Sequence, residues 1–168
     1  IQRHLDLDVG SLMEMEGENM QLHVHPVGDR AVRTMLDAVE LAIAQNGGPL
    51  ATQVTLSHIE LIDPADVERL VALGVVANYT PHWHGEFGHQ PSTANRFIGD
   101  DRDARKHPAR TLEDAGAVVS YSSDVIDASE LDRISPFLGM QIGITRTEPE
   151  PGAPTTGGDD EVLTIDQL

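Results

Sequence analysis

Residues 21–45 read QLHVHPVGDRAVRTMLDAVELAIAQ, and this stretch gives the clearest signal of the fold. Residues 21–25 alternate between polar and apolar side chains, which is the pattern of a strand with one polar face. We expect Asp29 to cap the helix that follows and the Gly-Gly-Pro run at 47–49 to end it. The stretch therefore predicts a strand, a loop and a helix in succession. The apolar residues of that helix recur at helical spacing, at Val32, Met35, Leu36, Val39, Ala42 and Ile43.

The same pattern continues along the chain. Strand-like segments recur at 53–58, 75–80 and 117–122. A helix with Asp63 as its N-cap, Pro64 as its first residue and Gly74 as its stop separates the first two, and a short helix at 111–115 precedes the last. Strands that alternate with helices at this spacing predict parallel βα units with right-handed crossovers. We therefore expect an α/β protein, with residues 149–168 as an exposed loop or tail rich in Pro, Gly and acidic residues.

The composition excludes several classes of partner. The 168 residues carry 28 acidic and 11 basic side chains, which gives a net charge of −17. This excess disfavours nucleic acid and anionic membranes, because neutralising phosphates needs clustered Lys and Arg. The chain has no cysteine and therefore no thiolate metal site, and no apolar run approaches the ~20 residues of a membrane span. No signal peptide is recognisable, so we expect a cytoplasmic protein.

Residues able to bind a metal stand at the ends of the expected strands. His25, His58, His82 and Asp124 each end a strand or follow it closely. The carboxyl ends of parallel strands share one edge of a sheet, where the chemistry of such folds collects. Two imidazoles and a carboxylate are ligands for a divalent cation such as Zn²⁺. Such a cation lowers the pKa of a bound water to about 7, so the edge predicts hydrolytic chemistry.

Each of these residues also has a purely structural interpretation. A histidine at a strand end is often a polar rim residue, and Asp124 can cap a following helix. Asp29 has an evident capping role, which is enough to explain its presence. Their joint placement, one in each βα unit at the same edge, favours the metal.

Two His-x-His pairs add further candidates. His23 and His25 share one strand face, and His82 and His84 flank Trp83. Either pair could chelate a metal. For His82 and His84, contact with substrate from a loop and plain solvent exposure are both open. The remaining histidines have no supporting neighbours and are expected at the surface, namely His4, His89 and His107.

Several motifs resemble those of a known family. The run HPVGDRAV at 25–32, followed by LDA at 36–38 and Glu40, resembles the strand-five segment HAIGDRAV…LDAxE of the YtcJ-like branch of the amidohydrolase superfamily, amidohydrolase family 3. SHIEL at 57–61 is similar to its strand-six segment EHAQL. GDDR at 99–102, residues 112–116 and SD at 123–124 resemble the run into strand eight. PFLG at 136–139 and TR at 145–146 match the helical stretch that follows, so the resemblance covers about residues 20–147.

The resemblance implies a metal-dependent amidohydrolase. The fold would be a partial (β/α)₈ TIM barrel, with strands five to eight in a domain at residues 1–148. The reaction would be hydrolysis of a C–N bond in a small amide-type substrate, with zinc or another divalent metal. His25 and His58 would be metal ligands, and Asp124 would contact the metal or its water and act as general acid/base. Asp29 would not bind the metal itself but would orient the loop or the His25 ring.

The sequence departs from the family pattern at several points. Pro26 stands for the usual Ala, Ser57 for the usual Glu, and the proline expected shortly after Asp124 is absent. The first-strand His-x-His and the fourth-strand Lys have no counterpart before residue 20. A complete barrel needs about 250 residues. We therefore expect a fragment with weak hydrolase activity or none, which self-associates or pairs with the missing N-terminal half. The alternative is a catalytically inactive amidohydrolase-like domain that self-associates.

Overall fold

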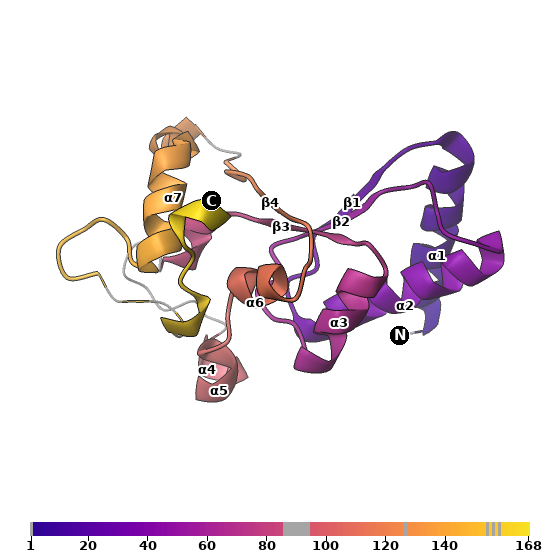
Figure 1. Cartoon of the computed structure of the whole chain (residues 1–168), viewed down its shortest axis with the longest axis horizontal. Helices are drawn as coiled ribbons and strands as arrows, with labels where there is room; N and C mark the ends of the chain where they lie inside the picture. The colour runs from indigo at the N-terminus through magenta and orange to yellow at the C-terminus, as the bar shows by residue number, and fades with distance from the viewer. Residues whose placement is uncertain (1, 86–94, 126–127, 154, 156, 158) are drawn as a thin grey trace.

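A parallel β-sheet forms the centre of the chain. The structure is a computed structural model that describes residues 2–85, 95–125, 128–153, 155, 157 and 159–168. The sheet has four strands in the order β1-β2-β3-β4, and all neighbouring pairs are parallel (Figure 1). This confirms the predicted α/β fold and each of the four expected strands. Their bounds are β1 Leu22–Val24, β2 Val54–Ser57, β3 Val76–Tyr79 and β4 Val119–Tyr121.

Helices occupy the connections between the strands, as the sequence predicts. No helix among the described residues is both long enough and apolar enough to cross a lipid bilayer. The α-helices are α1 Gln2–Glu18, α2 Asp29–Asn46, α3 Pro64–Ala72, α4 Asn95–Ile98, α5 Asp100–Asp103, α6 Ala109–Asp114 and α7 Pro136–Thr145. The short 3₁₀ turns are η1 Pro81–His84, η3 Ala128–Ile134, η4 Asp159–Glu161 and η5 Ile165–Gln167.

The predicted helix boundaries are correct at three positions and wrong at one. Asp63 caps α3 by accepting a hydrogen bond from the Ala65 backbone N–H at 3.0 Å. Gly47 ends α2 with a φ of 75°, a left-handed conformation that suits glycine, and Gly74 follows α3 with a φ of 66°. Asp29 does not cap α2: Gly28 holds that position, and Asp29 is the first residue of the helix.

The first helix, α1, has no counterpart among the predicted elements. Its side chains Val9 and Leu12 are buried, and α1 packs against α2. The Glu16 carboxylate accepts hydrogen bonds from the backbone N–H groups of Ala51 (2.9 Å) and Thr52 (2.7 Å). This helix therefore packs beside α2 and holds the α2–β2 loop.

The two faces of the sheet differ in chemistry. The first, here called the helix face, turns apolar side chains toward α2, α3 and α6, among them Val54, Leu56, Ala77 and Tyr79. The second, here called the polar face, carries the alternate residues of the same strands, among them His23, Ser57, Asn78 and Ser120. Because the side-chain period of a strand is two, one register fixes both faces at once.

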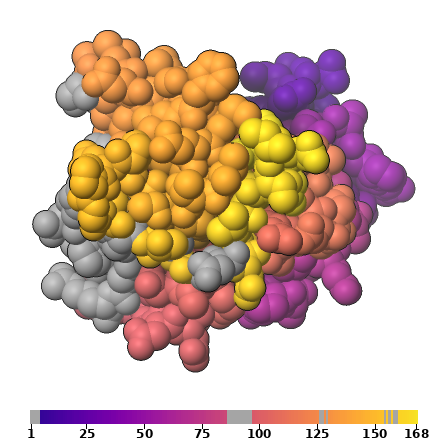
Figure 2. All heavy atoms as spheres, turned by 60° about the vertical axis from the view of Figure 1, so that its left-hand side comes forward, coloured from indigo at the N-terminus to yellow at the C-terminus, as the bar shows by residue number. Residues whose placement is uncertain are grey.

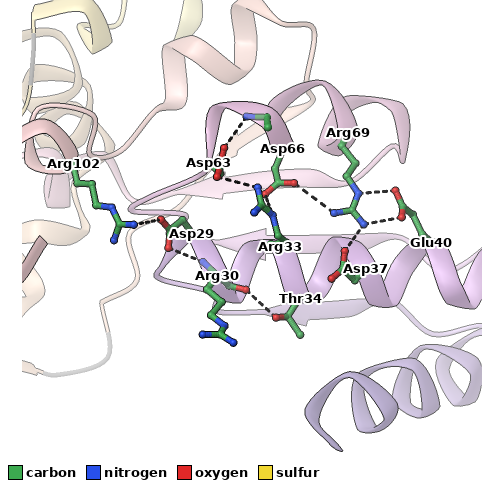
Figure 3. Close-up of polar contacts among 11 residues, drawn as sticks. Asp29, Arg30, Arg33, Thr34, Asp37, Glu40, Asp63, Asp66, Arg69 and Arg102 are labelled. Atoms are coloured by element: carbon green, nitrogen blue, oxygen red, sulfur yellow. Dashed lines mark hydrogen bonds and ion pairs between the residues drawn. The ribbon is translucent and has the colours of Figure 1, made fainter. Parts of the chain in front are cut away.

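A network of ion pairs joins α2 to α3 (Figure 3). The Arg69 guanidinium donates to Glu40 (2.6 and 2.7 Å) and to Asp37 (2.5 Å). Arg33 of α2 donates to Asp66 of α3 at 2.8 Å. These contacts hold α2 and α3 together on the helix face of the sheet.

The prediction of an exposed end at residues 149–168 is wrong for its last part. Leu163 is 1% exposed and its backbone N–H donates to Gly143 of α7 at 3.1 Å. The buried Glu161 carboxylate hydrogen-bonds the Thr111 hydroxyl of α6. In Figure 2 these last residues, in yellow, lie against α7 in orange. Contacts with helices distant in the sequence bury them, which the Pro/Gly-rich composition of the preceding residues does not reveal.

Candidate metal centre

His25 and His58 meet at the carboxyl edge of the sheet. Each is the first residue after its strand, β1 for His25 and β2 for His58. Their Nδ1 and Nε2 atoms, respectively, lie 2.8 Å apart. The two strands are paired in parallel, so the shared edge brings these side chains together as the sequence predicts.

An unusual backbone turn places the His58 ring. His58 and Ile59 have φ angles of 69° and 38°, in the left-handed region that such residues rarely adopt. The His58 backbone N–H donates to the Asn78 carbonyl at 3.0 Å, which holds the turn against β3. Strained turns of this kind concentrate at functional sites. Ile59, with no exposed surface, anchors the turn in the core while His58 faces the cavity.

Asp124 lies at the same edge, three residues beyond β4. Its Oδ2 atom is 4.0 Å from His58 Nε2, and the carboxylate is 25% exposed. Asp124 also has a positive φ, of 47°. All three predicted residues line one cavity of about 150 Å³, so the structure brings His25, His58 and Asp124 together.

The donor set fits a divalent cation in kind. Burial lowers the pKa of His58, an effect partly offset by the Asp124 carboxylate. His58 is therefore neutral at pH 7, which is the form that binds metals. Its Nδ1 atom is buried and has no hydrogen-bond partner among the described residues.

The distances between the donor atoms differ from those around a bound zinc ion. Two nitrogen ligands of a tetrahedral zinc ion stand about 3.3 Å apart. The His25–His58 distance is shorter than this and the His58–Asp124 distance is longer. Among the described residues, no group of three His, Asp or Glu side chains has the arrangement that holds an ion. The two imidazoles instead hydrogen-bond each other.

A row of hydrogen-bonded side chains on the polar face forms the wall beside these ligands. Asn78 Oδ1 accepts from the hydroxyls of Ser57 (3.1 Å) and Ser122 (2.9 Å), and its Nδ2 donates to Ser120 at 3.0 Å. Ser57 also hydrogen-bonds His23 Nε2. The role of Asn78 was not predicted from the sequence. The signal in the sequence was the alternation of side chains along the strands. It places Asn78 on the same face of the sheet as Ser57, which stands for the family's usual Glu.

The predicted substrate residues of the loop after β3 differ from each other. His82 is buried, and its carbonyl accepts a hydrogen bond from Arg133 at 3.0 Å. Burial, with the nearby Arg133 charge, lowers its pKa to about 4. Between His82 and His84, Trp83 is 42% exposed and stacks on the His58 ring, with 5.0 Å between ring centroids. Trp83 therefore covers one side of the candidate ligand His58, a contact that was not predicted from the sequence.

His84 and His107 contradict the expectation of exposure. The His84 ring has no exposed surface, stacks on His107 with 4.9 Å between centroids, and meets the edge of Tyr79. His107, expected at the surface, is only 3% exposed. Burial lowers the pKa of both rings well below its usual value. His84 therefore belongs to the interior. His89 lies outside the described residues.

Asp29, expected behind the ligands, contacts the loop and helix near them. Its Oδ1 accepts from the Arg30 backbone N–H at 2.8 Å, and its Oδ2 pairs with Arg102 of α5 at 3.2 Å (Figure 3). These contacts link the start of α2 to α5. They are compatible with a role in orienting the loop after His25.

Known proteins resemble this chain in sequence or in fold over part of their length. The amidohydrolase YtcJ of Bacillus subtilis (strain 168), whose assignment to that class is itself provisional, is 27% identical over 148 residues, which cover 87% of this chain and 26% of that protein. Crystal structures of uncharacterized metal-dependent hydrolases from Pyrococcus furiosus and Pyrococcus horikoshii OT3 match with TM-scores of 0.62 and 20% identity. They cover 88% and 95% of this chain but only 28% and 29% of those proteins.

These matches confirm the predicted fold and family. The structural likeness supports four βα units of a partial (β/α)₈ barrel. The chain spans about a quarter of the length of the proteins it resembles. A sequence model of the amidohydrolase family matches residues 15–168. The chain therefore belongs to the amidohydrolase family, in its YtcJ-like branch, amidohydrolase family 3.

Proposed function

We propose that this chain supplies metal ligands and a general acid/base for hydrolysis of a C–N bond in a small amide-type molecule. The observation that carries the proposal is the convergence of His25, His58 and Asp124 on one cavity, with the two imidazole nitrogens 2.8 Å apart. Membership in the amidohydrolase family agrees with this reaction class.

The residues of the cavity divide into two roles. His25 and His58 would hold the cation, for which zinc is our proposal because imidazole and carboxylate ligands suit it. A divalent cation, when bound, lowers the pKa of a water molecule and polarises a carbonyl group. His58 contributes a neutral imidazole because burial lowers its pKa.

We assign the movement of the proton to Asp124. Its carboxylate lies on the cavity and is partly exposed, so it can accept a proton from the attacking water. The water oxygen bonds to the carbonyl carbon, and Asp124 then returns the proton to the nitrogen as the C–N bond breaks. The products are a carboxylic acid and an amine.

A non-catalytic, self-associating domain is the second candidate. The absence of a ready three-ligand arrangement among the described residues favours it, as does Ser57, whose hydroxyl is occupied by His23 and Asn78. In either case we propose that the outer strands β1 and β4 associate with further barrel strands or with a second copy. Sedimentation velocity that shows only a stable monomer would contradict this association. A cytoplasmic location stays a prediction.

Zinc titration by calorimetry tests the proposal. The metal-free chain should bind about one zinc ion, and His25→Ala/His58→Ala should abolish that binding. Asp100→Asn/Asp101→Asn is the matched control, because these exposed acids lie outside the cavity and report on nonspecific binding to the acidic surface. Equal zinc binding by the parent chain and the double histidine variant would refute the assignment. It would favour the non-catalytic domain.

A further inference from the structure

A second cavity lies beside the metal centre. Its volume is about 380 Å³, within the range of small-molecule sites. We call it the α7 pocket, and its lining residues include Pro81, His82, Ser122, Ile134, Met140 and Leu168. Ser122 also lines the cavity of His25, His58 and Asp124. When the scissile bond of a substrate lies at the candidate metal centre, the rest of the molecule can therefore extend past Ser122 into the α7 pocket.

The pocket offers an apolar wall without an uncompensated charge. Proline, isoleucine, methionine and leucine side chains form much of it, and serine hydroxyls supply uncharged polar groups. His82 also lines the pocket and is uncharged at pH 7, because burial lowers its pKa to about 4. The Arg133 guanidinium in the wall is paired with the buried Glu148 carboxylate through hydrogen bonds of 2.6 and 3.1 Å. Arg133 also donates to the His82 carbonyl, so its charge and its donors are already engaged.

We infer that the α7 pocket binds the uncharged apolar substituent of the substrate and rejects one that ends in a carboxylate or an ammonium group. A charged group there would lose its hydration without gaining a partner of opposite charge. The inference rests on the proposed function for the position of the scissile bond. The binding preference itself follows from the pocket.

Three six-carbon probes test the preference. Hexanamide, 5-carboxypentanamide and 6-aminohexanamide share the amide head and differ only at the far end of the chain, and they are titrated into the metal-free chain at pH 7 and followed by saturation-transfer NMR. The buffer contains 0.5 M NaCl, which screens the general effect of the net charge of −17. Hexanamide should bind at least about tenfold more tightly than either ion, because an unpaired charge is costly to bury. Equal affinity for all three probes would overturn the inference.

Two substitutions on one helix locate the binding. Met140→Glu places a carboxylate in the wall of the pocket, whereas Phe137→Glu makes the same change at a side chain that is 77% exposed and does not line it. Met140→Glu should weaken hexanamide binding at least about tenfold, and Phe137→Glu should leave it unchanged. Ser135→Glu provides a second test if Met140→Glu does not fold. Ser135 lines the pocket at the start of α7, where a helix tolerates an acidic residue, so the Glu at this position should also weaken hexanamide binding.

The outcomes separate this inference from the proposed function. Loss of binding in both the Met140 and the Phe137 variants, or in neither, would overturn the pocket assignment. If the chain binds no zinc but shows the expected probe preference, the pocket stands and the proposed function falls. If zinc binds through His25 and His58 but the preference is absent, only the pocket assignment falls.

Discussion

The helix face and the polar face of the same sheet differ in what their buried residues do. On the helix face, Leu56 and Ala77 are almost fully buried against helices. On the polar face, Ser57 and Asn78 are also buried, but each is held by side-chain hydrogen bonds that lead to the candidate ligands. Burial alone therefore does not distinguish the hydrophobic core from the polar face. The helix face contributes stability, and the polar face positions chemistry at the strand ends.

The largest expected effect breaks the helix face. Leu56→Ala should lower the free energy of unfolding by about 3 kcal/mol, because it removes a buried side chain and leaves a cavity. Urea denaturation measures the change. The neighbouring Ser57→Ala is the matched control on the polar face and should cost about 1 kcal/mol. Equal losses at the two positions would remove the distinction between the faces.

The next effect breaks the polar face at its centre. Asn78→Ala removes the shared partner of Ser57, Ser120 and Ser122, and should lower the free energy of unfolding by about 2 kcal/mol. Zinc affinity should also fall, because the wall beside the ligands loosens. The same urea experiment and a zinc titration measure the two changes. Ser120→Ala removes only one of these hydrogen bonds and should lower the stability and the zinc affinity less. If Asn78→Ala has the same stability and zinc affinity as the parent chain, the row of hydrogen bonds does not organise the polar face.

Acid tests the buried histidines near the polar face. Because burial lowers the pKa of His82 to about 4, the unfolded chain binds the proton more readily at intermediate pH. The free energy of unfolding should therefore fall as pH drops through about 6.5, the ordinary pKa of histidine, toward 4. In His82→Gln, unfolding at pH 5 should take up about one proton fewer. An identical pH dependence in parent and variant would show that His82 is not shielded as described.

The smallest effect concerns the ion pairs outside the sheet. Arg69→Ala should cost about 1 kcal/mol at low salt, because its closest acidic partners, Asp37 and Glu40, are partly exposed and solvent screens them. In 1 M NaCl the difference between parent and variant should shrink. Thermal unfolding at the two salt concentrations measures it. A loss as large as that of Leu56→Ala would mean that charge pairing outweighs the packing of the helix face.

Local sequence patterns were enough to predict the sheet but not all of its surroundings. Strand alternation, helical spacing and the Asp63-Pro64 and Gly47 signals act within a few residues, so they can be recognised in the chain alone. The convergence of His25 and His58 also followed, because parallel strands share an edge. Burial of His84, His107 and Leu163 depends on contacts between segments far apart in the sequence.

The metal environment tests the central claim most directly. The X-ray absorption spectrum of the zinc-loaded chain should show imidazole scattering from two histidines, with nitrogen ligands at about 2.0–2.1 Å. That signal should disappear in His25→Ala/His58→Ala. A shell of oxygen ligands only, unchanged by the double substitution, would contradict the claim that these two histidines form a metal centre.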